Sequence, residues 1–448
     1  MFRTVLVANR GEIARCIVRG CRVLGLRTVA VYSEADRDAP HVRDADQAVL
    51  LGPAPARESY LSVERILAAA RESGADAVHP GYGFLSENWR FAQACAEAGL
   101  TFIGPSPEAI RAMGDKPEAR TRMAAAGVPI VPGSPEPVAD AAIAQRFAGR
   151  VGYPIILKAA AGGGGIGMAK VAKESDLEGA FATATRRAQA AFGRAEVYLE
   201  HYVERGRHVE VQVFGDTKGT VVHLFERECS IQRRHQKLVE ESPAPNLDAV
   251  TWRGLTDAAV AGARAIGYVN AGTLEFLVDE GGGFYFLEMN TRLQVEHPVT
   301  EEVTGQDLVV AQLRVAAGEP LPFTQETLER RGAALEVRVY AEDPAKNFLP
   351  SPGTLSRLVL PAGEGIRVES GVVEGSEVSV HYDPLLFKLI ARGADRAQAI
   401  ERLAGALEAC VVEGVKTTLP LLHKIVAHPQ FRAGRVHTQM VEQGAFNG

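Results

Sequence analysis

The first hundred residues alternate between short apolar runs and stretches with helical spacing. Val5–Ala8, Thr28–Tyr32 and Ala75–His79 predict strands. The turn at residues 9–12 leads into a predicted helix that continues to about Leu24. Alternating strands and helices are typical of a parallel sheet with helices on both faces. Ligands of such folds bind mainly in the loops at the carboxyl ends of the strands.

A proline-rich stretch, Pro129–Pro137, follows this region and predicts a linker. Beyond it, Ile155–Lys158 and Met168–Val171 predict two strands that flank a run of glycines. A helix is predicted from about Ser175, and a further strand at Glu196–Glu200. The pattern therefore indicates a second compact unit between the linker and about residue 203.

From about residue 202 onward the pattern is rich in strands, and one helix, Asp395–Glu408, is predicted near the end. At roughly 100–200 residues per domain, the chain length predicts two to four domains. The whole pattern predicts a mixed α/β and α+β protein. The strands are predicted at Val209–Phe214, Val221–Phe225, Gly272–Val278, Phe284–Asn290 and Ala334–Tyr340.

Composition excludes several classes of protein. Hydrophobic residues make up 46% of the 448 residues and charged residues 23%, the ordinary globular mixture. The net charge of −6 is spread along the chain without a basic block, so nucleic-acid binding is not expected. No apolar run approaches the roughly 18 residues of a membrane helix, and the first residues lack signal-peptide features. The five cysteines form no C-x-x-C pair, so we expect reduced thiols in a cytoplasmic enzyme.

The glycine run at residues 161–167 has a formal G-x-G-x-x-G match. A predicted strand follows it, whereas a dinucleotide fingerprint needs a helix there. No Gly-Lys-Ser/Thr closes the run, so it is not a Walker loop either. A strand–glycines–strand layout instead predicts a flap whose backbone N–H groups cover phosphates, with Lys158 within reach. The alternative is a plain hairpin tip beside a surface lysine.

Two predicted strands, Gly272–Val278 and Phe284–Asn290, are joined by a turn that contains three glycines. If the turn is centred between its first and second glycine, Glu275 lies directly opposite Glu288. The Cβ atoms of such a pair are about 4.5–5.5 Å apart. Two carboxylates at that distance repel each other unless one is protonated or a cation sits between them. A divalent cation would satisfy both.

The polar face of the second strand is predicted to continue through alternate residues. Asn290 lies on the face of Glu288, and an all-oxygen ligand set suits Mg²⁺ or Mn²⁺. Arg292, Gln294 and Glu296 follow on the same face. Arg292 can bind a planar oxyanion through its guanidinium fork, and Glu296 is placed to act as a general base. The alternative is an antiparallel strand with one solvated face.

With these residues identified, the chain resembles the ATP-grasp ligases and, within them, the biotin carboxylases. The resemblance implies three domains: a Rossmann-like N-terminal domain (1–114), an ATP-grasp region (115–334) with a mobile lid at about 131–203, and a catalytic C-terminal domain with an antiparallel sheet (335–448). The matching stretches are Ala8–Ala14, His79–Asn88, Gly114–Lys116, the glycine loop, Glu226–Lys237 and Glu288–Thr300.

The resemblance also implies a role for each matching residue. The expected ATP contacts are Lys116, Lys158, Gly164, Gly165, His208 and His235, with Glu200, His201, Tyr202 and Val203 around the adenine. The expected ligands of two divalent ions, Mg²⁺ or Mn²⁺, are Glu275, Glu288 and Asn290. The expected bicarbonate site is Lys237, Arg292, Gln294 and the backbone of Val295. Arg338 is expected to hold the ureido oxygen of biotin, and Tyr82 and Gly83 are expected to approach biotin.

Some residues carry less weight than the rest. A single histidine is more often structural than functional, so His208 and His235 depend on the resemblance. The family commonly has a basic residue in the glycine loop and another after the methionine, where this chain has Ile166 and Ala169. Both changes remove charge near the phosphates. Since the backbone donors of the loop remain, we expect ATP binding to survive, with lower affinity.

The implied reaction is the ATP-dependent carboxylation of biotin. Glu296 would deprotonate bicarbonate, which would attack the γ-phosphate of ATP and form carboxyphosphate. Carboxyphosphate would break down to CO₂ and phosphate, the phosphate would take the N1′ proton of biotin, and Arg338 would stabilise the resulting anion. The chain has no Met-Lys-Met sequence. We therefore expect biotin on a separate carrier protein and a separate carboxyltransferase. The resemblance further implies a homodimer and an acyl-CoA carboxylase of fatty acid biosynthesis as the complete enzyme.

Two other functions are compatible with parts of the pattern. A different ATP-grasp ligase, such as an aminoimidazole ribonucleotide carboxylase or half of a carbamoyl-phosphate synthetase, would keep the metal hairpin but not the block Ser230–Lys237. A nucleotide-sensing regulator on an inactive ligase scaffold would have lost Glu296, Arg292 or Arg338. All three are present in this chain.

Overall fold

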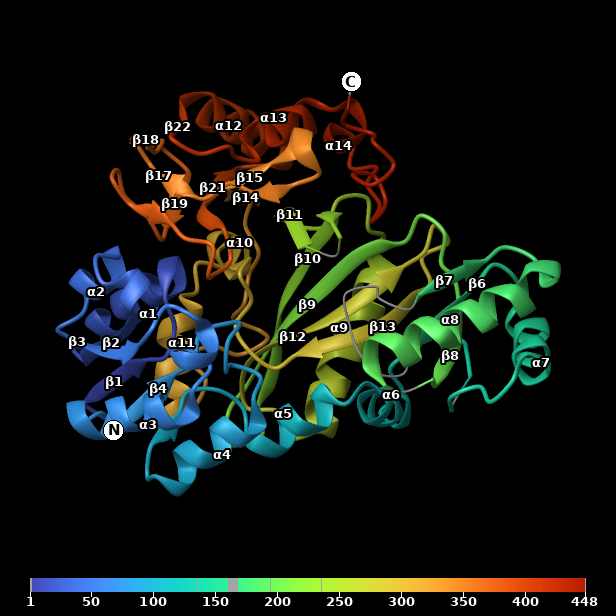
Figure 1. The fold of residues 1–448 in the computed structure, drawn as a ribbon, viewed down its shortest axis with the longest axis horizontal. Coiled ribbons are helices and arrows are strands. Elements are labelled where there is room, and N and C mark those ends of the chain that lie inside the picture. The colour runs from blue at the N-terminus through green and yellow to red at the C-terminus, as the bar shows by residue number, and fades with distance from the viewer. Residues whose placement is uncertain (1, 135, 160–167, 194, 235, 448) are drawn as a thin grey trace.

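The computed structural model describes residues 2–134, 136–159, 168–193, 195–234 and 236–447. Figure 1 shows an N-terminal unit in blue, a lid-like unit in green on the opposite side, and a C-terminal unit in orange and red above a long central sheet. The mixed α/β and α+β architecture predicted from the sequence is therefore confirmed. The parallel sheet lies in the N-terminal unit, and the antiparallel strands lie beyond it.

The N-terminal sheet is parallel and has the strand order β3-β2-β1-β4-β5. Its order reverses between β1 and β4, where ligands of open parallel sheets bind. Asn9 follows β1 and donates hydrogen bonds of 2.7 Å to the carbonyls of Pro80 and Tyr82 after β4, which joins the two loops. The strands are β1 (Thr4–Val7), β2 (Arg27–Ser33), β3 (Gln47–Gly52), β4 (Ala77–His79) and β5 (Thr101–Phe102). The helices are α1 (Gly11–Val23), α2 (Pro40–Asp44), α3 (Val63–Ser73), α4 (Trp89–Glu97) and α5 (Pro107–Gly114).

The lid is a small antiparallel sheet with the order β7-β6-β8, and two helices pack on it through a shared apolar core. Figure 1 shows it projecting to one side of the central sheet. Its predicted strands and helix are confirmed. The elements are α7 (Ala141–Val151), β6 (Ile155–Ala159), β7 (Ala169–Val171), α8 (Leu177–Phe192) and β8 (Val197–His201).

The central sheet is antiparallel and has eight strands, in the order β13-β12-β9-β10-β11-β14-β21-β19. The boundary predicted at residues 334/335 falls inside β14, which pairs with β11 on one side and β21 on the other. One sheet therefore crosses this boundary, and the division into domains stays a prediction. The strands are β9 (Arg207–Gly215), β10 (Val221–Arg233), β11 (Gln236–Ser242), β12 (Asn270–Val278), β13 (Phe284–Asn290), β14 (Ala333–Tyr340), β19 (Ile366–Ser370) and β21 (Leu385–Gly393).

Alternation along β9 decides which face of the sheet becomes polar. Val209, Val211 and Val213 belong to an apolar core that they share with helix α9. Successive strand residues point to opposite faces, so His208 and Glu210 point to the other face.

The remaining helices are α6 (Lys116–Ala125), α9 (Ala249–Ala265), α10 (His297–Thr304), α11 (Leu308–Ala316), α12 (Arg396–Ala409), α13 (Leu419–Ala427) and α14 (Pro429–Arg432). The short strands are β15 (Glu342–Asp343), β16 (Leu349–Pro350), β17 (Gly353–Thr354), β18 (Arg357–Val359), β20 (Glu377–Val378) and β22 (Val411–Glu413).

The predicted pairing of Glu275 with Glu288 across the β12–β13 hairpin is confirmed, although the turn differs from the prediction. Asp279 N donates to Gly283 O at 2.8 Å, so the turn is centred on the first glycine. A β-bulge at Leu287 then shifts the register by one residue before the two glutamates are reached. The shift of the turn centre and the bulge cancel each other in the register, so Glu275 still lies opposite Glu288.

The predicted continuation of the strand beyond Asn290 is wrong. Strand β13 ends at Asn290, and the chain runs as a loop into helix α10, with Glu296 at its N-cap position. Pro298 lies in the first turn of that helix, where its missing N–H costs no hydrogen bond. Arg292, Gln294 and Glu296 are therefore arranged by a loop and a helix start, not by strand alternation.

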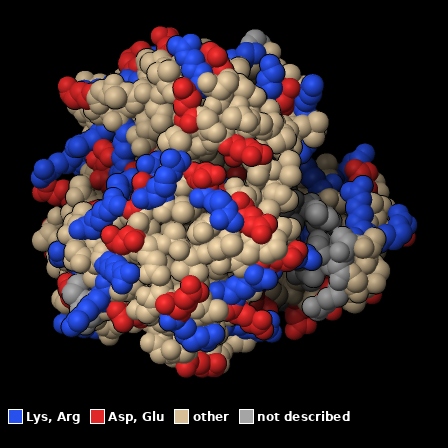
Figure 2. Space-filling view, turned by 60° about the vertical axis from the view of Figure 1, so that its left-hand side comes forward, with Lys and Arg blue, Asp and Glu red and all other residues tan. Residues whose placement is uncertain are grey.

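The distribution of surface charge and the state of the cysteines match what the composition predicts. Figure 2 shows basic and acidic side chains interspersed over the face turned to the viewer. No helix among the described residues is long and apolar enough to cross a membrane. The five cysteines are free thiols, as predicted.

We expect Gly215→Ala, at the end of β9, to destabilise the fold. A Cβ atom there would lie 2.0 Å from the backbone carbonyl oxygen of Tyr268, which cannot move aside as a side chain could. Overpacking of this kind costs roughly 1–3 kcal/mol, measurable by urea unfolding. Gly405→Ala, in helix α12 with open space around it, is the control and should be neutral or stabilising. Equal stability of the two variants would contradict the packing argument.

Candidate active site

A row of charged residues crosses the polar face of the central sheet. By register, Glu288 on β13 lies opposite Glu275 on β12, Glu275 opposite Glu210 on β9, and Glu210 opposite Arg227 on β10. Arg227 is fully buried, and its Nε lies 2.6 Å from Glu210 Oε1. It also donates to the hydroxyl of Thr300 in α10 at 2.8 Å. The row therefore crosses four strands, and Arg227 at its end connects it to the helix that follows the loop.

Lys237, on β11, is the centre of this site. Its Nζ lies 2.5 Å from Glu210, 2.9 Å from Glu275 and 2.6 Å from Glu296. Burial alone would lower the pKa of the lysine, but the three carboxylates raise it well above its usual value. The ammonium therefore stays charged. It supplies the positive charge that allows three buried carboxylates to lie together.

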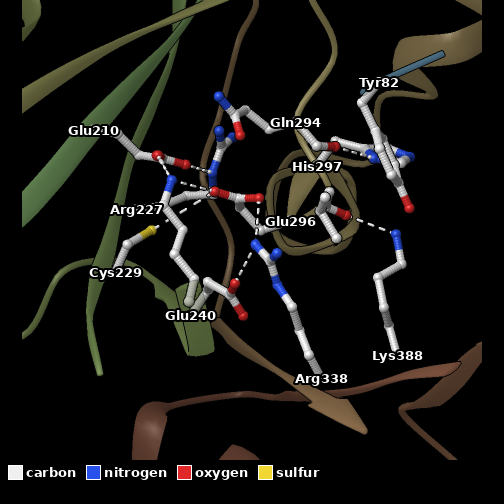
Figure 3. A network of polar contacts seen from close by, with 12 residues as sticks. Tyr82, Glu210, Arg227, Cys229, Glu240, Gln294, Glu296, His297, Arg338 and Lys388 are labelled. Atoms are coloured by element: carbon white, nitrogen blue, oxygen red, sulfur yellow. Dashed lines mark hydrogen bonds and ion pairs between the residues drawn. The ribbon is translucent and has the colours of Figure 1, made fainter. Parts of the chain in front are cut away.

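Glu296 is fully buried between two cations. One carboxylate oxygen faces Lys237, and the other accepts a hydrogen bond of 2.8 Å from Arg338 on β14. Burial acts to raise the pKa of Glu296, but Lys237 and then Arg338 hold it well below its usual range. Figure 3 shows Arg338 directed at both Glu296 and Glu240. Burial raises the pKa of Glu240, on β11, to about 7 despite Arg338 beside it.

The hairpin offers oxygen atoms to a metal ion. Glu275 and Asn290 are buried and joined by a 2.9 Å hydrogen bond, whereas the side chain of Glu288 is 44% exposed. An all-oxygen set that is open on one side fits Mg²⁺ or Mn²⁺. The protein also supplies basic groups here. His208 lies 3.0 Å from Glu275, which raises the pKa of the imidazole although burial acts to lower it, and the ammonium of Lys116 lies 3.4 Å from Glu288. These side chains therefore offset part of the repulsion between Glu275 and Glu288, which, from the sequence, a metal ion is expected to relieve.

Arg292 is held by neighbours on both sides. Its Nε lies 2.9 Å from Glu87 of the N-terminal unit, and one terminal nitrogen donates to Asn290 Oδ1 at 2.8 Å. Gln294 is buried, and its Nε2 has no hydrogen-bond partner among the described residues. A buried amide N–H without a partner costs free energy unless a ligand or water accepts its hydrogen bond. Gln294 is therefore placed to donate to a ligand.

The lid meets the body of the protein at Glu200. Lys158 lies 2.5 Å from Glu200 within the lid, and Arg120 of α6 lies 2.6 Å from the other carboxylate oxygen. Burial would raise the pKa of Glu200, but Lys158 and then Arg120 lower it. The main chain of His201 also donates to Pro132 O at 2.8 Å. The two segments that connect lid and body thus run side by side.

A cavity of about 1520 Å³ lies between the lid, the polar face of the sheet and the N-terminal unit. The structure brings most of the predicted site residues together on its wall. These are Tyr82, Gly83, Lys116, Lys158, Glu200, His201, Tyr202, Val203, His208, Lys237, Glu275, Glu288, Asn290, Arg292, Gln294, Val295 and Arg338.

Four of the predicted residues stand apart from that set. Glu296 does not line the cavity, since it is fully buried and touches Lys237 and Arg338, which do. Gly164, Gly165 and His235 lie outside the described residues, as does Ile166, and their predicted roles stay predictions.

Sequence reasoning missed several buried charges of the site: Glu210, Arg227, Glu240 and Lys388. A signal for Glu210 was available, because it alternates with His208 along one strand in the same way as Asn290 alternates with Glu288. No local signal distinguishes Lys388, whose role depends on its distance from residues about a hundred positions away.

With this geometry established, comparisons with known proteins identify the family. Residues 1–110 match the sequence profile of the biotin carboxylase N-terminal domain, and residues 336–443 match that of the biotin carboxylase C-terminal domain. Residues 115–324 match the carbamoyl-phosphate synthase L chain ATP-binding domain. Biotin carboxylase 2 of Bacillus subtilis is 54% identical over 443 residues, which cover 99% of this chain and 100% of that protein. The chain belongs to the biotin carboxylase family. It is accordingly an ATP-dependent ligase, and the resemblance noted in the sequence is confirmed.

Other relatives of this family member belong to larger or different carboxylases. The mitochondrial methylcrotonoyl-CoA carboxylase alpha chain of Arabidopsis thaliana is 52% identical over 98% of this chain and 60% of that protein. One of the pyruvate carboxylase subunits of Methanothermobacter thermautotrophicus is 50% identical over 99% of this chain and 90% of that protein. The middle profile is named for carbamoyl-phosphate synthase, so the two flanking profiles are what distinguish the chain from other ATP-grasp ligases.

Solved structures of the family superpose over the whole chain. The biotin carboxylase domain of a thermophilic 2-oxoglutarate carboxylase bound to bicarbonate has a TM-score of 0.95 at 46% identity and covers 100% of this chain and 99% of that one. The corresponding domain dimer from Hydrogenobacter thermophilus, in complex with MgADP, ADP and bicarbonate, has a TM-score of 0.93 at 47% identity, with the same coverage. The ATP-grasp architecture predicted from the sequence is thereby confirmed.

We expect Glu288→Gln to weaken Mn²⁺ binding by at least about tenfold, since it replaces a charged oxygen ligand with an amide of the same shape. Isothermal titration with Mn²⁺ in the presence of ADP measures this directly. Glu280→Gln is the matched control, because Glu280 lies in the exposed turn of the same hairpin and its side chain is 71% exposed. Unchanged affinity in Glu288→Gln would remove this carboxylate from the ligand set.

Proposed function

We propose that the chain transfers a carboxyl group from bicarbonate to N1′ of biotin at the expense of ATP, with carboxyphosphate as the intermediate. The observation that carries this proposal is the position of Glu296. A buried carboxylate is held at 2.6 Å by a lysine and at 2.8 Å by an arginine, and both cations line the cavity. The arrangement places a proton acceptor behind two groups that bind anions.

ATP would bind between lid and body. Glu200, His201, Tyr202 and Val203 line the wall where the two segments meet and would surround the adenine. Lys116 and Lys158 would contact the phosphates from opposite sides, with the glycine loop covering them. Closure of the lid would exclude water from the labile intermediate. The Hydrogenobacter thermophilus domain dimer is in complex with MgADP, ADP and bicarbonate, which supports a nucleotide with Mg²⁺ and bicarbonate as ligands of this chain.

Glu275, Glu288 and Asn290 would hold the divalent cations, with Mg²⁺ preferred for an all-oxygen set. Mg²⁺ bound there would offset the negative charge on the transferring phosphoryl group. Lys116 beside Glu288 and Lys237 beside Glu275 would act in the same direction. Their ammonium groups already lie 3.4 Å and 2.9 Å from these carboxylates.

Bicarbonate would bind to Arg292, Gln294, Lys237 and the backbone of Val295. Alone, Glu296 is a weak base, because Lys237 and Arg338 depress its pKa. Bicarbonate and the ureido oxygen of biotin would draw these two cations toward the cavity. Loss of their attraction raises the pKa of Glu296, so the carboxylate becomes a stronger base when the substrates are in place.

Biotin would bind beside Arg338. The guanidinium would stabilise the negative charge on the ureido oxygen as N1′ loses its proton to phosphate. Tyr82 and Gly83 line the same cavity and would pack against the ring system. We assign biotin to a separate carrier protein, and the carboxyl group to an acyl-CoA through a separate carboxyltransferase. The pyruvate and 2-oxoglutarate carboxylases among the relatives make a keto acid the competing acceptor. We also propose a homodimer, which the domain dimer of the Hydrogenobacter enzyme supports, and a cytoplasmic location.

We expect ADP release by the purified chain to require bicarbonate and to rise on addition of free biotin. A coupled assay with each component omitted in turn measures both dependences. The expected result distinguishes biotin carboxylation from other ATP-grasp reactions, which use different acceptors. Stimulation by an amine acceptor without any effect of biotin would overturn the assignment.

We expect Glu296→Gln to retain ATP binding and to lower kcat by about 10²–10⁴-fold, the usual contribution of general base catalysis. The change keeps the shape of the side chain but removes its proton acceptor. Nucleotide affinity by fluorescence titration and kcat by ADP release separate the two effects. Glu329→Gln, an exposed glutamate that pairs with Arg331, should behave as wild type. Wild-type turnover in Glu296→Gln would exclude Glu296 as the base.

A further inference from the structure

Two consecutive carbonyl groups at the start of helix α10 are held by buried side chains. Gln294 O lies 2.7 Å from His297 Nδ1, and Val295 O accepts a hydrogen bond of 2.6 Å from Lys388 Nζ. Figure 3 shows Lys388 and His297 beside this turn, each joined to it by a dashed line. Gln294 and Val295 line the cavity, whereas Lys388 and His297 do not. The two side chains therefore contact the turn without forming part of the cavity wall themselves.

His297 is a neutral donor to the turn. It is fully buried, and burial lowers its pKa well below the usual range, with Lys388 and Arg367 acting in the same direction. A carbonyl oxygen can only accept, so Nδ1 carries the proton. The other ring nitrogen, Nε2, then lacks a proton and lies 3.7 Å from the thiol of Cys16 in α1. The imidazole is thus fixed in one tautomer.

Lys388 is a charged donor, and it is also fully buried. Its Nζ lies 3.1 Å from Glu12 Oε1, and this carboxylate with other acidic groups keeps the pKa of the lysine raised despite its burial. The same oxygen of Glu12 accepts a hydrogen bond from the hydroxyl of Tyr82. One ammonium therefore links the central sheet, the turn before α10 and the N-terminal unit.

Because each peptide group is planar and trans, the direction of its held carbonyl also fixes the direction of its N–H group. In a planar trans peptide the C=O and N–H bonds point in opposite directions. The carbonyl of Gln294 shares a peptide with the N–H of Val295, and the carbonyl of Val295 shares one with the N–H of Glu296. Within the part of the chain that the structure describes, neither N–H donates to a protein acceptor.

We propose that Lys388 and His297 are positioning residues that turn the N–H groups of Val295 and Glu296 together toward the cavity, where both bind one oxygen of bicarbonate. The inference rests on the proposed function, since bicarbonate is the anion that this site would take. Two adjacent backbone donors fixed in direction form an anion-binding nest that needs no reorganisation when the substrate arrives. The side chain of Gln294, whose Nε2 has no hydrogen-bond partner within the described parts of the chain, lines the same cavity.

Lys388→Met is the direct test, but it leaves Glu12 buried without its cation and can unfold the protein. The informative comparison is therefore Glu12→Gln against the double variant Glu12→Gln/Lys388→Met, in which both members of the Glu12–Lys388 ion pair are removed. The difference between these two isolates the contact to Val295 O. His297→Phe removes the other donor without involving a charge. Arg392→Met, an exposed arginine further along the same strand β21, is the control.

Steady-state ADP release at varied bicarbonate and varied ATP, with thermal unfolding as a check on the fold, gives the result. We expect the double variant and His297→Phe each to raise the KM for bicarbonate on the order of tenfold or more, with the KM for ATP and the Tm close to those of their references. Arg392→Met should leave both KM values unchanged.

An unchanged KM for bicarbonate in folded variants would overturn the inference, as would an equal rise in the KM for ATP, which indicates a structural role only. Failure of the proposed function has a different signature. In that case the wild-type protein itself would release no ADP in response to bicarbonate, and no variant would be needed to see it.

Discussion

The site depends on one buried ammonium group surrounded by carboxylates. Lys237 contacts Glu210, Glu275 and Glu296, which come from two strands and from the turn before α10. Removing one partner of a buried ion pair leaves an uncompensated charge and costs roughly 3–5 kcal/mol. The lysine therefore fixes the positions of these elements relative to one another. Without it, the polar face of the sheet could not be buried in this form.

The same network prepares the site for anionic substrates. Its cations are already desolvated and are paired with carboxylates of the protein, so an incoming anion exchanges partners instead of removing a hydration shell. In the proposed mechanism Glu296 would gain basicity in the same exchange, because the two cations that would move away from it are those that depress its pKa. In the proposed reaction, binding of bicarbonate and activation of Glu296 as its base would be two results of one rearrangement.

The continuous sheet explains how segments far apart in the chain act on one reaction. Arg338 on β14 pairs with Lys388 on β21, and these strands belong to the same sheet as the β12–β13 hairpin. Arg338 contacts the turn before α10 through the carboxylate of Glu296, and Lys388 contacts it through the carbonyl oxygen of Val295. The turn is held from both sides by neighbouring strands, which places its donors and its carboxylate together.

The sequence alone determined the features that depend on near neighbours. Strand alternation and a glycine turn were enough to pair Glu275 with Glu288, although a bulge and a shifted turn had to compensate for each other. The motifs in Glu226–Lys237 and Glu288–Thr300 were enough to indicate the family. Only the tertiary structure decided that Glu296 is buried behind two cations, and that Glu210 and Lys388 belong to the site. Those contacts join residues 27 to 93 positions apart, and their strength comes from burial and charge balance, which no local pattern of residues records.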